Sequence, residues 1–287
     1  QAVTSFDADY PRLLLEIPDP PFALFYAGNL ERFHSPAVAI VGSRDASRYG
    51  RDVAARLAKE LSSVGVTVVS GFARGVDEAA HEAALGGAGG TIAVLGCGID
   101  VDYPREHSRL KSELLRQNLM ISEFVPGTEP RPANFPVRNR IIAGLAAGVV
   151  VVEASRRSGS LITARLAGDF GRDVFAVPGS VFSPTSAGSH ELLRDGAILC
   201  RGAEDVLAEI FPAIEASAAA RPETPSGNLS SQAREVLEAL RRESSSAEEL
   251  SREKDWPAAT VLTALFELEE AGLAISDEQG RYGLRRT

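Results

Sequence analysis

Short, almost entirely apolar segments alternate with longer segments of helical periodicity between residues 37 and 210. We predict strands at 37–41, 66–70, 91–95, 119–122, 148–152 and 174–177, and helices at 48–64, 76–85, 104–117, 137–147 and 161–170. Strands as apolar as these are buried on both faces, which is typical of a parallel sheet. Regular alternation of strands and helices indicates βαβ units, so the predicted fold class is α/β with a doubly wound parallel sheet.

The character of the chain changes after residue 210. Residues 211–228 are rich in Pro, Ala, Ser and Gly and have little apolar periodicity, which indicates a linker. Three helices, at 231–242, 246–254 and 257–271, then precede two short strands at 273–276 and 282–284, which is the order of a winged-helix domain. We therefore predict a main domain over 1–212, a linker over 213–228 and a small winged-helix domain over 229–287.

Turns rich in glycine, serine and arginine follow several of the predicted strands. Ligands of doubly wound sheets bind at the carboxyl ends of the strands, so these turns hold the candidate residues. Gly42, Ser43 and Arg44 follow the first strand. The glycine permits close approach of a ligand, the next helix offers free N–H groups, and the guanidinium suits a phosphate. Neither GxGxxG nor a P-loop motif occurs there, so the turn has no dinucleotide or triphosphate fingerprint.

Three further segments have the same character. Their candidates are Gly71 and Arg74 after the second strand, Asn134, Phe135, Arg138, Asn139 and Arg140 within 131–140, and Ser158, Gly159, Ser160 and Thr163 after the fifth strand. An aromatic ring among arginines suits single-stranded nucleic acid, because bases stack on the ring while cations contact the phosphates. Taken alone, Phe135 fits a core position equally well, and Ser160 could be only an N-cap. Together the four turns predict a groove lined with phosphate donors.

Catalytic and metal sites have weaker support. The four histidines are scattered, and the pair His81-Glu82 lacks the second histidine of an HExxH zinc site. The two cysteines are 103 residues apart, with no CxxC pair, so neither a zinc site nor a disulfide framework is indicated. Four carboxylates near the strand ends could do acid–base chemistry, but helix caps and ion pairs explain them as well; they are Asp77, Asp100, Asp102 and Glu153. We predict no catalytic residue, metal or cofactor.

The charge of the chain limits the kind of partner. With 30 basic and 39 acidic residues the net charge is -9 and the pI about 5.1, which excludes indiscriminate coating by nucleic acid but not a local basic site. Three of the 30 basic residues are lysines, so 27 are arginines; either codon bias or a need for guanidinium groups at phosphates accounts for this. No apolar run reaches ~18 residues and no leader pattern is present, so we expect a cytoplasmic protein without a membrane span.

Five motifs, in order, resemble the DprA family of bacterial DNA-processing proteins. They are Gly42-Ser43-Arg44, the segments 70–77 (SGFARGVD) and 135–142 (FPVRNRII), and the segments 158–164 (SGSLITA) and 175–179 (FAVPG). The resemblance extends from about residue 10 to residue 210, and the tail resembles the winged-helix domain of some members in the order and size of its elements. Many members also have a small helical SAM-like domain before the Rossmann part, which we expect this chain to lack.

The resemblance implies a Rossmann-like domain that binds single-stranded DNA without catalysis. It further implies protection of incoming strands during natural transformation, loading of the RecA recombinase, possible contact with a single-strand DNA-binding protein, and a homodimer. The family's pocket arginine corresponds to Arg44, its base-contacting aromatic to Phe135, and the arginine of its SGxARGxD motif to Arg74. The family's dimer interface corresponds to 188–199, where the apolar candidates are Leu192, Leu193, Ile198 and Leu199; core packing explains these nearly as well.

Two other functions stay open at the level of sequence. An enzyme of the related lysine-decarboxylase-like group, a phosphoribohydrolase, would also use glycine-rich strand ends and a carboxylate such as Glu153, but its PGGxGT motif is missing. A transcription factor would read duplex DNA through the tail. The third tail helix has Glu267, Glu269 and Glu270 and no basic residue, which is unfavourable beside phosphates.

Overall fold

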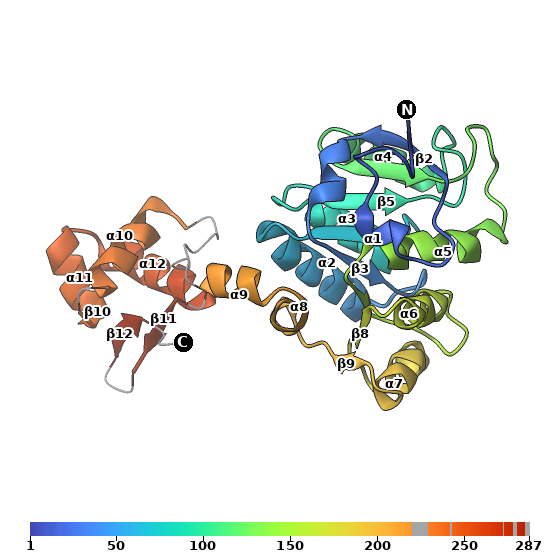
Figure 1. Cartoon of the computed structure of the whole chain (residues 1–287). Helices are drawn as coiled ribbons and strands as arrows, with labels where there is room; N and C mark the ends of the chain where they lie inside the picture. The colour runs from blue at the N-terminus through green and yellow to red at the C-terminus, as the bar shows by residue number, and fades with distance from the viewer. Residues whose placement is uncertain (220–228, 242, 272, 278–279, 285–287) are drawn as a thin grey trace. The chain divides into compact units, whose positions relative to one another are not determined.

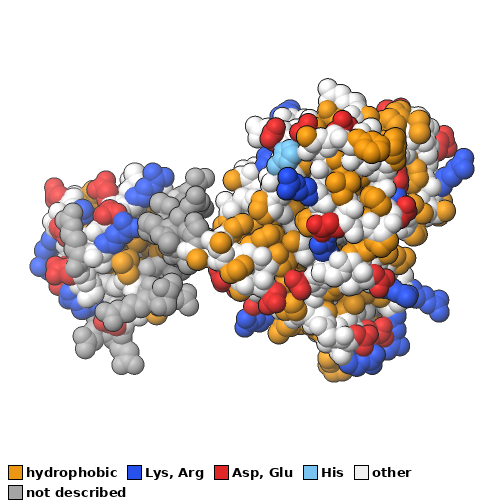
Figure 2. All heavy atoms as spheres, in the orientation of Figure 1, with side chains coloured by type: hydrophobic (Ala, Val, Ile, Leu, Met, Phe, Trp, Pro, Cys, Tyr) orange, Lys and Arg blue, Asp and Glu red, His pale blue; other side chains and the backbone are white. Residues whose placement is uncertain are grey.

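The computed structural model describes residues 1–219, 229–241, 243–271, 273–277 and 280–284. The chain divides into two compact units, Gln1–Ala218 and Ala219–Thr287, each with its own hydrophobic core. No helix among the described residues has the length and apolarity needed to cross a membrane. On the face shown in Figure 2, acidic and basic side chains of the larger unit are interspersed, as expected for a net acidic surface without bulk positive charge.

Nine strands of the described chain form one sheet in the larger unit (Figure 1). In spatial order they are β1 (Ala2–Thr4), β2 (Ala23–Gly28), β6 (Leu119–Ser122), β5 (Thr91–Val94), β4 (Thr67–Ser70), β3 (Ala37–Val41), β7 (Gly148–Val151), β8 (Asp173–Ala176) and β9 (Ile198–Leu199). All neighbours from β6 to β9 are parallel, whereas β1–β2 and β2–β6 are antiparallel. The α/β fold class and all six predicted strands are confirmed; β1, β2 and β9 are additions.

Alternate side chains of the central strands supply the cores on the two faces of the sheet. Val38 and Ile40 of β3 pack with α2 (Arg48–Ser63), α3 (Val76–Ala84) and α8 (Ala203–Ile210). The intervening Ala39 and Val41 pack with α1 (Arg12–Leu15), α5 (Asn134–Leu145) and α6 (Ser160–Asp169) on the opposite face. Both faces are therefore covered by helices, which is why the strands are apolar without alternation.

The order of the strands reverses between β3 and β7. From β3 the chain continues through α2 to β4 on one side, whereas from β7 it continues through α6 to β8 on the other. The loops that leave the carboxyl ends of these two neighbouring strands diverge, so a crevice opens between them. In doubly wound sheets this switch point is where ligands bind.

Two predicted helices have different bounds. The helix expected at 104–117 is a 3-10 turn at Arg105–His107 followed by α4 (Ser108–Leu114). The helix expected from residue 137 begins earlier, as α5 at Asn134, so Phe135 and Pro136 lie in its first turn rather than in the preceding loop. Proline is compatible with a first helical turn because the N–H groups there have no intrahelical partner. The remaining helices of this unit are α7 (Ala187–Arg194) and α9 (Pro212–Ala219).

The smaller unit has the predicted winged-helix fold. Its elements are α10 (Ser231–Leu240), β10 (Ser245–Ser246), α11 (Ala247–Lys254), α12 (Ala258–Glu270), β11 (Ala274–Ser276) and β12 (Arg281–Leu284). The three strands pair in the order β10-β12-β11 around a core that includes Val236, Leu250 and Leu265. The segment predicted to be a linker, 213–228, is helical as far as Ala219, and its remaining residues lie outside the described ranges.

Candidate nucleic-acid interface

A pocket of about 640 Å³ lies at the switch point of the sheet. The turn after β3 supplies Gly42, Ser43 and Arg44, the first turn of α5 supplies Phe135, and the segment between β7 and α6 supplies the rest of one wall. Six more of the predicted site residues line this pocket: Arg138, Asn139, Ser158, Gly159, Ser160 and Thr163. Two others, Gly71 and Arg74, line an adjoining pocket. Loops that are far apart in the sequence thus converge on one site.

A ridge formed by Arg44, Phe135 and Tyr103 separates the two pockets, and all three side chains line both. The guanidinium carbon of Arg44 lies 5.1 Å from the centroid of the Phe135 ring, which is a cation–π distance. The centroid of the Tyr103 ring lies 5.7 Å from that of Phe135, with the ring planes 32° apart. Phe135 is therefore a half-buried ring at the pocket rather than a core side chain.

The turns after β3 and β4 approach each other so closely that glycine is required between them. Gly75 has a φ of +82°, a region that side chains disfavour, and a Cβ on it would lie 2.5 Å from the carbonyl oxygen of Ser43. The N–H of Val76 donates to the same carbonyl at 3.2 Å. Gly75 therefore fixes the turn that presents Arg44 against the start of α3.

Arg138 is a buried residue of the pocket lining. Its side chain donates to the carbonyl oxygens of Gly71, at 2.7 Å, and Val94, and its residue is 4% exposed. Burial lowers the pKa of this guanidinium to about 10. The predicted direct contact of Arg138 with DNA is not supported by this geometry, because its donors join the turn after β4 to the last residue of β5.

Asp77 is the counter-charge of Arg138. The two side chains converge on Gly71. A Cβ on this glycine would lie 2.7 Å from a carboxylate oxygen of Asp77 and 2.8 Å from a guanidinium nitrogen of Arg138. The carboxylate also accepts hydrogen bonds from the N–H groups of Gly71, at 3.1 Å, and Ala73, at 3.3 Å. Burial raises the pKa of Asp77, while Arg138 and these donors act in the opposite direction. The carboxylate thus shapes the Gly71–Ala73 turn at the edge of the pocket, where the residue is 7% exposed.

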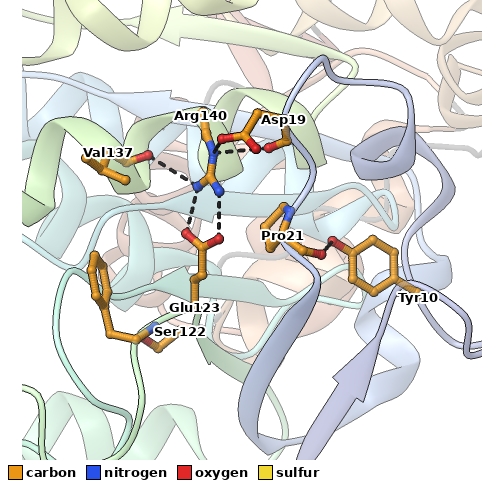
Figure 3. Close-up of polar contacts among 8 residues, drawn as sticks. Tyr10, Asp19, Pro21, Ser122, Glu123, Val137 and Arg140 are labelled. Atoms are coloured by element: carbon orange, nitrogen blue, oxygen red, sulfur yellow. Dashed lines mark hydrogen bonds and ion pairs between the residues drawn. The ribbon is translucent and has the colours of Figure 1, made fainter.

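Arg140 is not among the residues that line either pocket, contrary to its predicted place in the DNA site. Figure 3 shows its contacts. Its guanidinium makes a bidentate pair with Glu123, with N–O distances of 2.8 and 2.6 Å, and a third contact with Asp19 at 3.1 Å. Its side chain is only 14% exposed. Beside this network the hydroxyl of Tyr10 donates to the carbonyl of Pro21 at 2.6 Å, and burial raises the pKa of that phenol. Arg140 therefore ties α5 to β6 and to the N-terminal segment.

The remaining polar candidates stiffen the pocket walls. Asn134 donates to the carbonyl of Gly96 at 3.1 Å, which ties the start of α5 to the turn after β5. Asn139 donates to the carbonyl of Gly159 at 3.2 Å and so holds the loop before α6. The hydroxyls of Ser158 and Ser160 are 2.7 Å apart at the first turn of that helix. Hydroxyls and the N-terminus of a ten-residue helix therefore face the pocket opposite Arg44.

The carboxylates considered for acid–base chemistry have structural partners. Glu153 is 3% exposed and accepts from the N–H and the hydroxyl of Ser47, at 2.9 and 2.7 Å, at the N-cap of α2. Asp100 accepts from the N–H of Gly127 at 2.8 Å, and Asp102 pairs with Lys111 at 2.8 Å. Among the described residues no group of His, Cys, Asp and Glu has the arrangement of a metal site.

The apolar residues expected at a dimer interface divide into two kinds. Leu192 and Ile198 pack against the two cores, so their side chains are largely used within the unit. Leu193 is half-buried, and Leu199 is 45% exposed on the edge strand β9. Leu199 is therefore the candidate with the most surface left for a partner.

Sequence reasoning did not identify Tyr103, whose ring contributes to both pockets. It lies after the glycine turn that follows β5, immediately before Pro104. That turn, Gly96-Cys97-Gly98, follows the carboxyl end of a parallel strand, as the turns with the predicted site residues do. Its position in the sequence could therefore have indicated that residues near it belong to the site. Ser155 and Ile162 are further lining residues that were not predicted.

Comparison with known proteins is consistent with this site. The family described as DNA recombination-mediator protein A matches residues 1–211, and the DprA winged helix domain matches residues 218–278. Protein Smf of Escherichia coli is 41% identical over 286 residues, which cover 96% of this chain and 75% of that protein.

Two solved structures have the same fold. DNA processing protein A from Streptococcus pneumoniae has a TM-score of 0.70 and 47% identity, covering 73% of this chain and 74% of that one. DNA processing protein A from Helicobacter pylori, described for its single-stranded DNA binding mode, has a TM-score of 0.65 and 30% identity over 76% of this chain and 96% of that one. The two family matches, over 1–211 and 218–278, include both pockets and most of the winged-helix unit. The chain therefore belongs to the DNA recombination-mediator protein A family, also called DprA or Smf.

Proposed function

We propose that this protein is a non-enzymatic recombination mediator that binds single-stranded DNA at the pocket of the switch point. The observation that carries the proposal is the convergence of the Arg44–Phe135 pair with the hydroxyls and helix N-terminus of α6 on one cavity. Phosphates would lie against Arg44 and the α6 terminus, and a base would stack on the Arg44–Phe135 pair. Bases in a duplex are already stacked and paired, so the pocket favours single strands.

The proposal includes the partners that the family resemblance implies. In it, a homodimer formed around Leu193 and Leu199 protects incoming single strands and loads RecA onto them, including strands covered by a single-strand DNA-binding protein. The family description as a recombination mediator and the exposed apolar edge at Leu199 support this part. A cytoplasmic location follows from such partners.

An enzyme that acts on nucleotides has less support. Glu153, its best carboxylate, is buried and committed to the N-cap of α2. Asp77 is 7% exposed at the pocket and is already engaged by backbone N–H groups and by Arg138, which makes it a poor base for a substrate.

A duplex-reading transcription factor also has less support. The outward face of α12 presents Leu262, which is 50% exposed, and Phe266, which is 60% exposed. An exposed apolar helix face suits a protein partner better than phosphates, so the winged helix is proposed as a partner-binding module.

Titration of the full chain with fluorescently labelled dT20 at several salt concentrations tests the proposal. Binding should be stronger than to a blunt duplex of equal length, with a log–log salt slope of about -0.7 per phosphate neutralised. Equal affinity for the duplex would overturn the single-strand proposal. RecA filament assembly on dT-rich DNA coated with single-strand DNA-binding protein tests the mediator step, with Arg44→Ala as the inactive control.

A further inference from the structure

A second pocket, of about 440 Å³, lies across the ridge from the first. Its own walls come from the turns after β4 and β5 and from the 3-10 turn before α4. It shares Arg44, Ala73, Tyr103 and Phe135 with the first pocket, so the ridge is a common wall and the two cavities are neighbours. The binding proposed above uses the first pocket, and of the residues that line only the second pocket, Gly71 and Arg74 are predicted DNA contacts.

The second pocket is lined by more positive than negative charge. Arg44, Arg74 and Arg105 line it, against the single exposed carboxylate of Glu106. Arg74 is 3.9 Å from Glu106, a loose pair between side chains that are both more than half exposed. Arg105 is exposed and has no ion pair among the described residues. Exposed pairs of this kind contribute little and are readily exchanged for a phosphate.

The second pocket also has an aromatic wall. Tyr103 is 39% exposed, whereas the Phe135 ring has the Arg44 guanidinium over it. Gly96 forms part of the floor, and a Cβ there would lie 2.7 Å from the Phe135 ring, so the glycine gives the ring its place against the loop. Tyr103 is thus the more accessible ring of the ridge. A ring between exposed arginines is the combination that binds a nucleotide without sequence preference.

We propose that the second pocket binds the neighbouring nucleotide of the same DNA strand. Its base stacks on Tyr103, its phosphate contacts Arg74 and Arg105, and the strand crosses the Arg44–Phe135 ridge. One domain then holds two consecutive nucleotides instead of one. This inference rests on the proposed single-strand binding at the first pocket.

Titration of Tyr103→Leu and Arg105→Ala with dT20 tests the second subsite. Loss of stacking should weaken binding by Tyr103→Leu about 5- to 150-fold. Arg105→Ala should reduce the magnitude of the salt slope by about 0.7. Arg109→Ala is the matched control, because Arg109 is exposed one turn further on and pairs with Glu113 outside this pocket. Its affinity and slope should equal those of the wild type.

The outcomes separate the two proposals. Unchanged affinity and slope in both variants, with strong loss in Arg44→Ala, would overturn the second subsite and leave the first intact. Failure of the wild type to bind dT20 would overturn both. If Tyr103→Leu does not fold, as judged by thermal denaturation, Arg105→Ala decides alone, because its side chain is exposed. In support, dT20 carrying one 5-iododeoxyuridine should crosslink to Tyr103 on irradiation.

Discussion

The guanidinium carbon of Arg44 lies 5.1 Å from the centroid of the Phe135 ring, so the two residues act as one surface. Arginine stacks on aromatic rings and keeps its in-plane N–H groups free for a phosphate. A cation–π contact at such an exposed site is worth about 0.5–1 kcal/mol. The pair is therefore suited to contact a phosphate and to stack a base at the same place.

Substitutions in this pair should not be additive. Arg44→Ala removes a phosphate contact and should reduce the magnitude of the salt slope by about 0.7. Phe135→Ala should weaken dT20 binding by about 1–3 kcal/mol through lost stacking. The double variant should lose less than the sum of the two, because each single change already removes their contact. Strict additivity in the titrations would show that the residues bind independently.

Arg138→Met should destabilise the fold. The change leaves the buried carboxylate of Asp77 without its positive neighbour, a loss of about 3–5 kcal/mol in the free energy of unfolding. Urea denaturation measures it, and Asp77→Asn in the same chain should restore part of the loss. Arg131→Ala is the control, since that side chain is exposed and makes no ion pair with any of the described residues. An Arg138→Met variant of normal stability that lost only DNA binding would return this arginine to the DNA site.

Arg140→Ala should lower the free energy of unfolding but leave unchanged the number of DNA phosphates that the protein neutralises. Its charged hydrogen bonds to Glu123 and Asp19 are worth about 1–3 kcal/mol in total, which denaturation would detect. The salt slope for dT20 should stay at the wild-type value because the guanidinium lies outside both pockets. A slope reduced by about 0.7 would instead support the direct contact that the sequence suggested.

Stability should fall in acid because of His81. This ring is fully buried, its Nδ1 lies 2.7 Å from the hydroxyl of Thr91, and burial lowers its pKa from 6.5 to about 3. Between these values the unfolded chain binds one proton more than the folded chain, so stability declines as pH falls from 6.5 towards 3. The slope from this group is at most about 1.4 kcal/mol per pH unit. Urea denaturation at several pH values should show a smaller slope for His81→Gln.

In the proposed homodimer, Leu199→Asp should shift the equilibrium from dimer towards monomer. A charge on this half-exposed position of β9 would be buried in a symmetric interface without a partner. Sedimentation velocity gives the mass directly. Leu262→Asp, at a similarly exposed leucine of the winged-helix unit, should leave the oligomeric state unchanged.

The parallel part of the fold could be predicted because its signal is local. Six strands are almost entirely apolar, so no partner had to be known to locate them. The strands that escaped prediction lie at the sides of the sheet. For example, β2 pairs with β1 about twenty residues before it and with β6 about ninety residues after it, so its pairing cannot be read from its own residues.

The same distinction applies to the site. The position of the pocket could be predicted because each glycine- and arginine-rich turn that lines it is a motif of only a few consecutive residues. The interior role of Arg140 could not be predicted, since its carboxylate partners are 17 and 121 residues away. Arg138 presents the same difficulty: its partners Gly71 and Val94 lie 67 and 44 residues away. An arginine in a sequence does not reveal whether its donors will face solvent.

The pairing of β3 with β7 has a consequence for synthesis. Val38 lies opposite Gly148 in this ladder, so the pocket walls after the two strands are made about a hundred residues apart. A nascent chain that has not yet extended through α6 carries Arg44 and Phe135 but lacks the opposite wall. The complete pocket, and with it the proposed binding of a DNA strand, therefore exists only after most of the larger unit has left the ribosome.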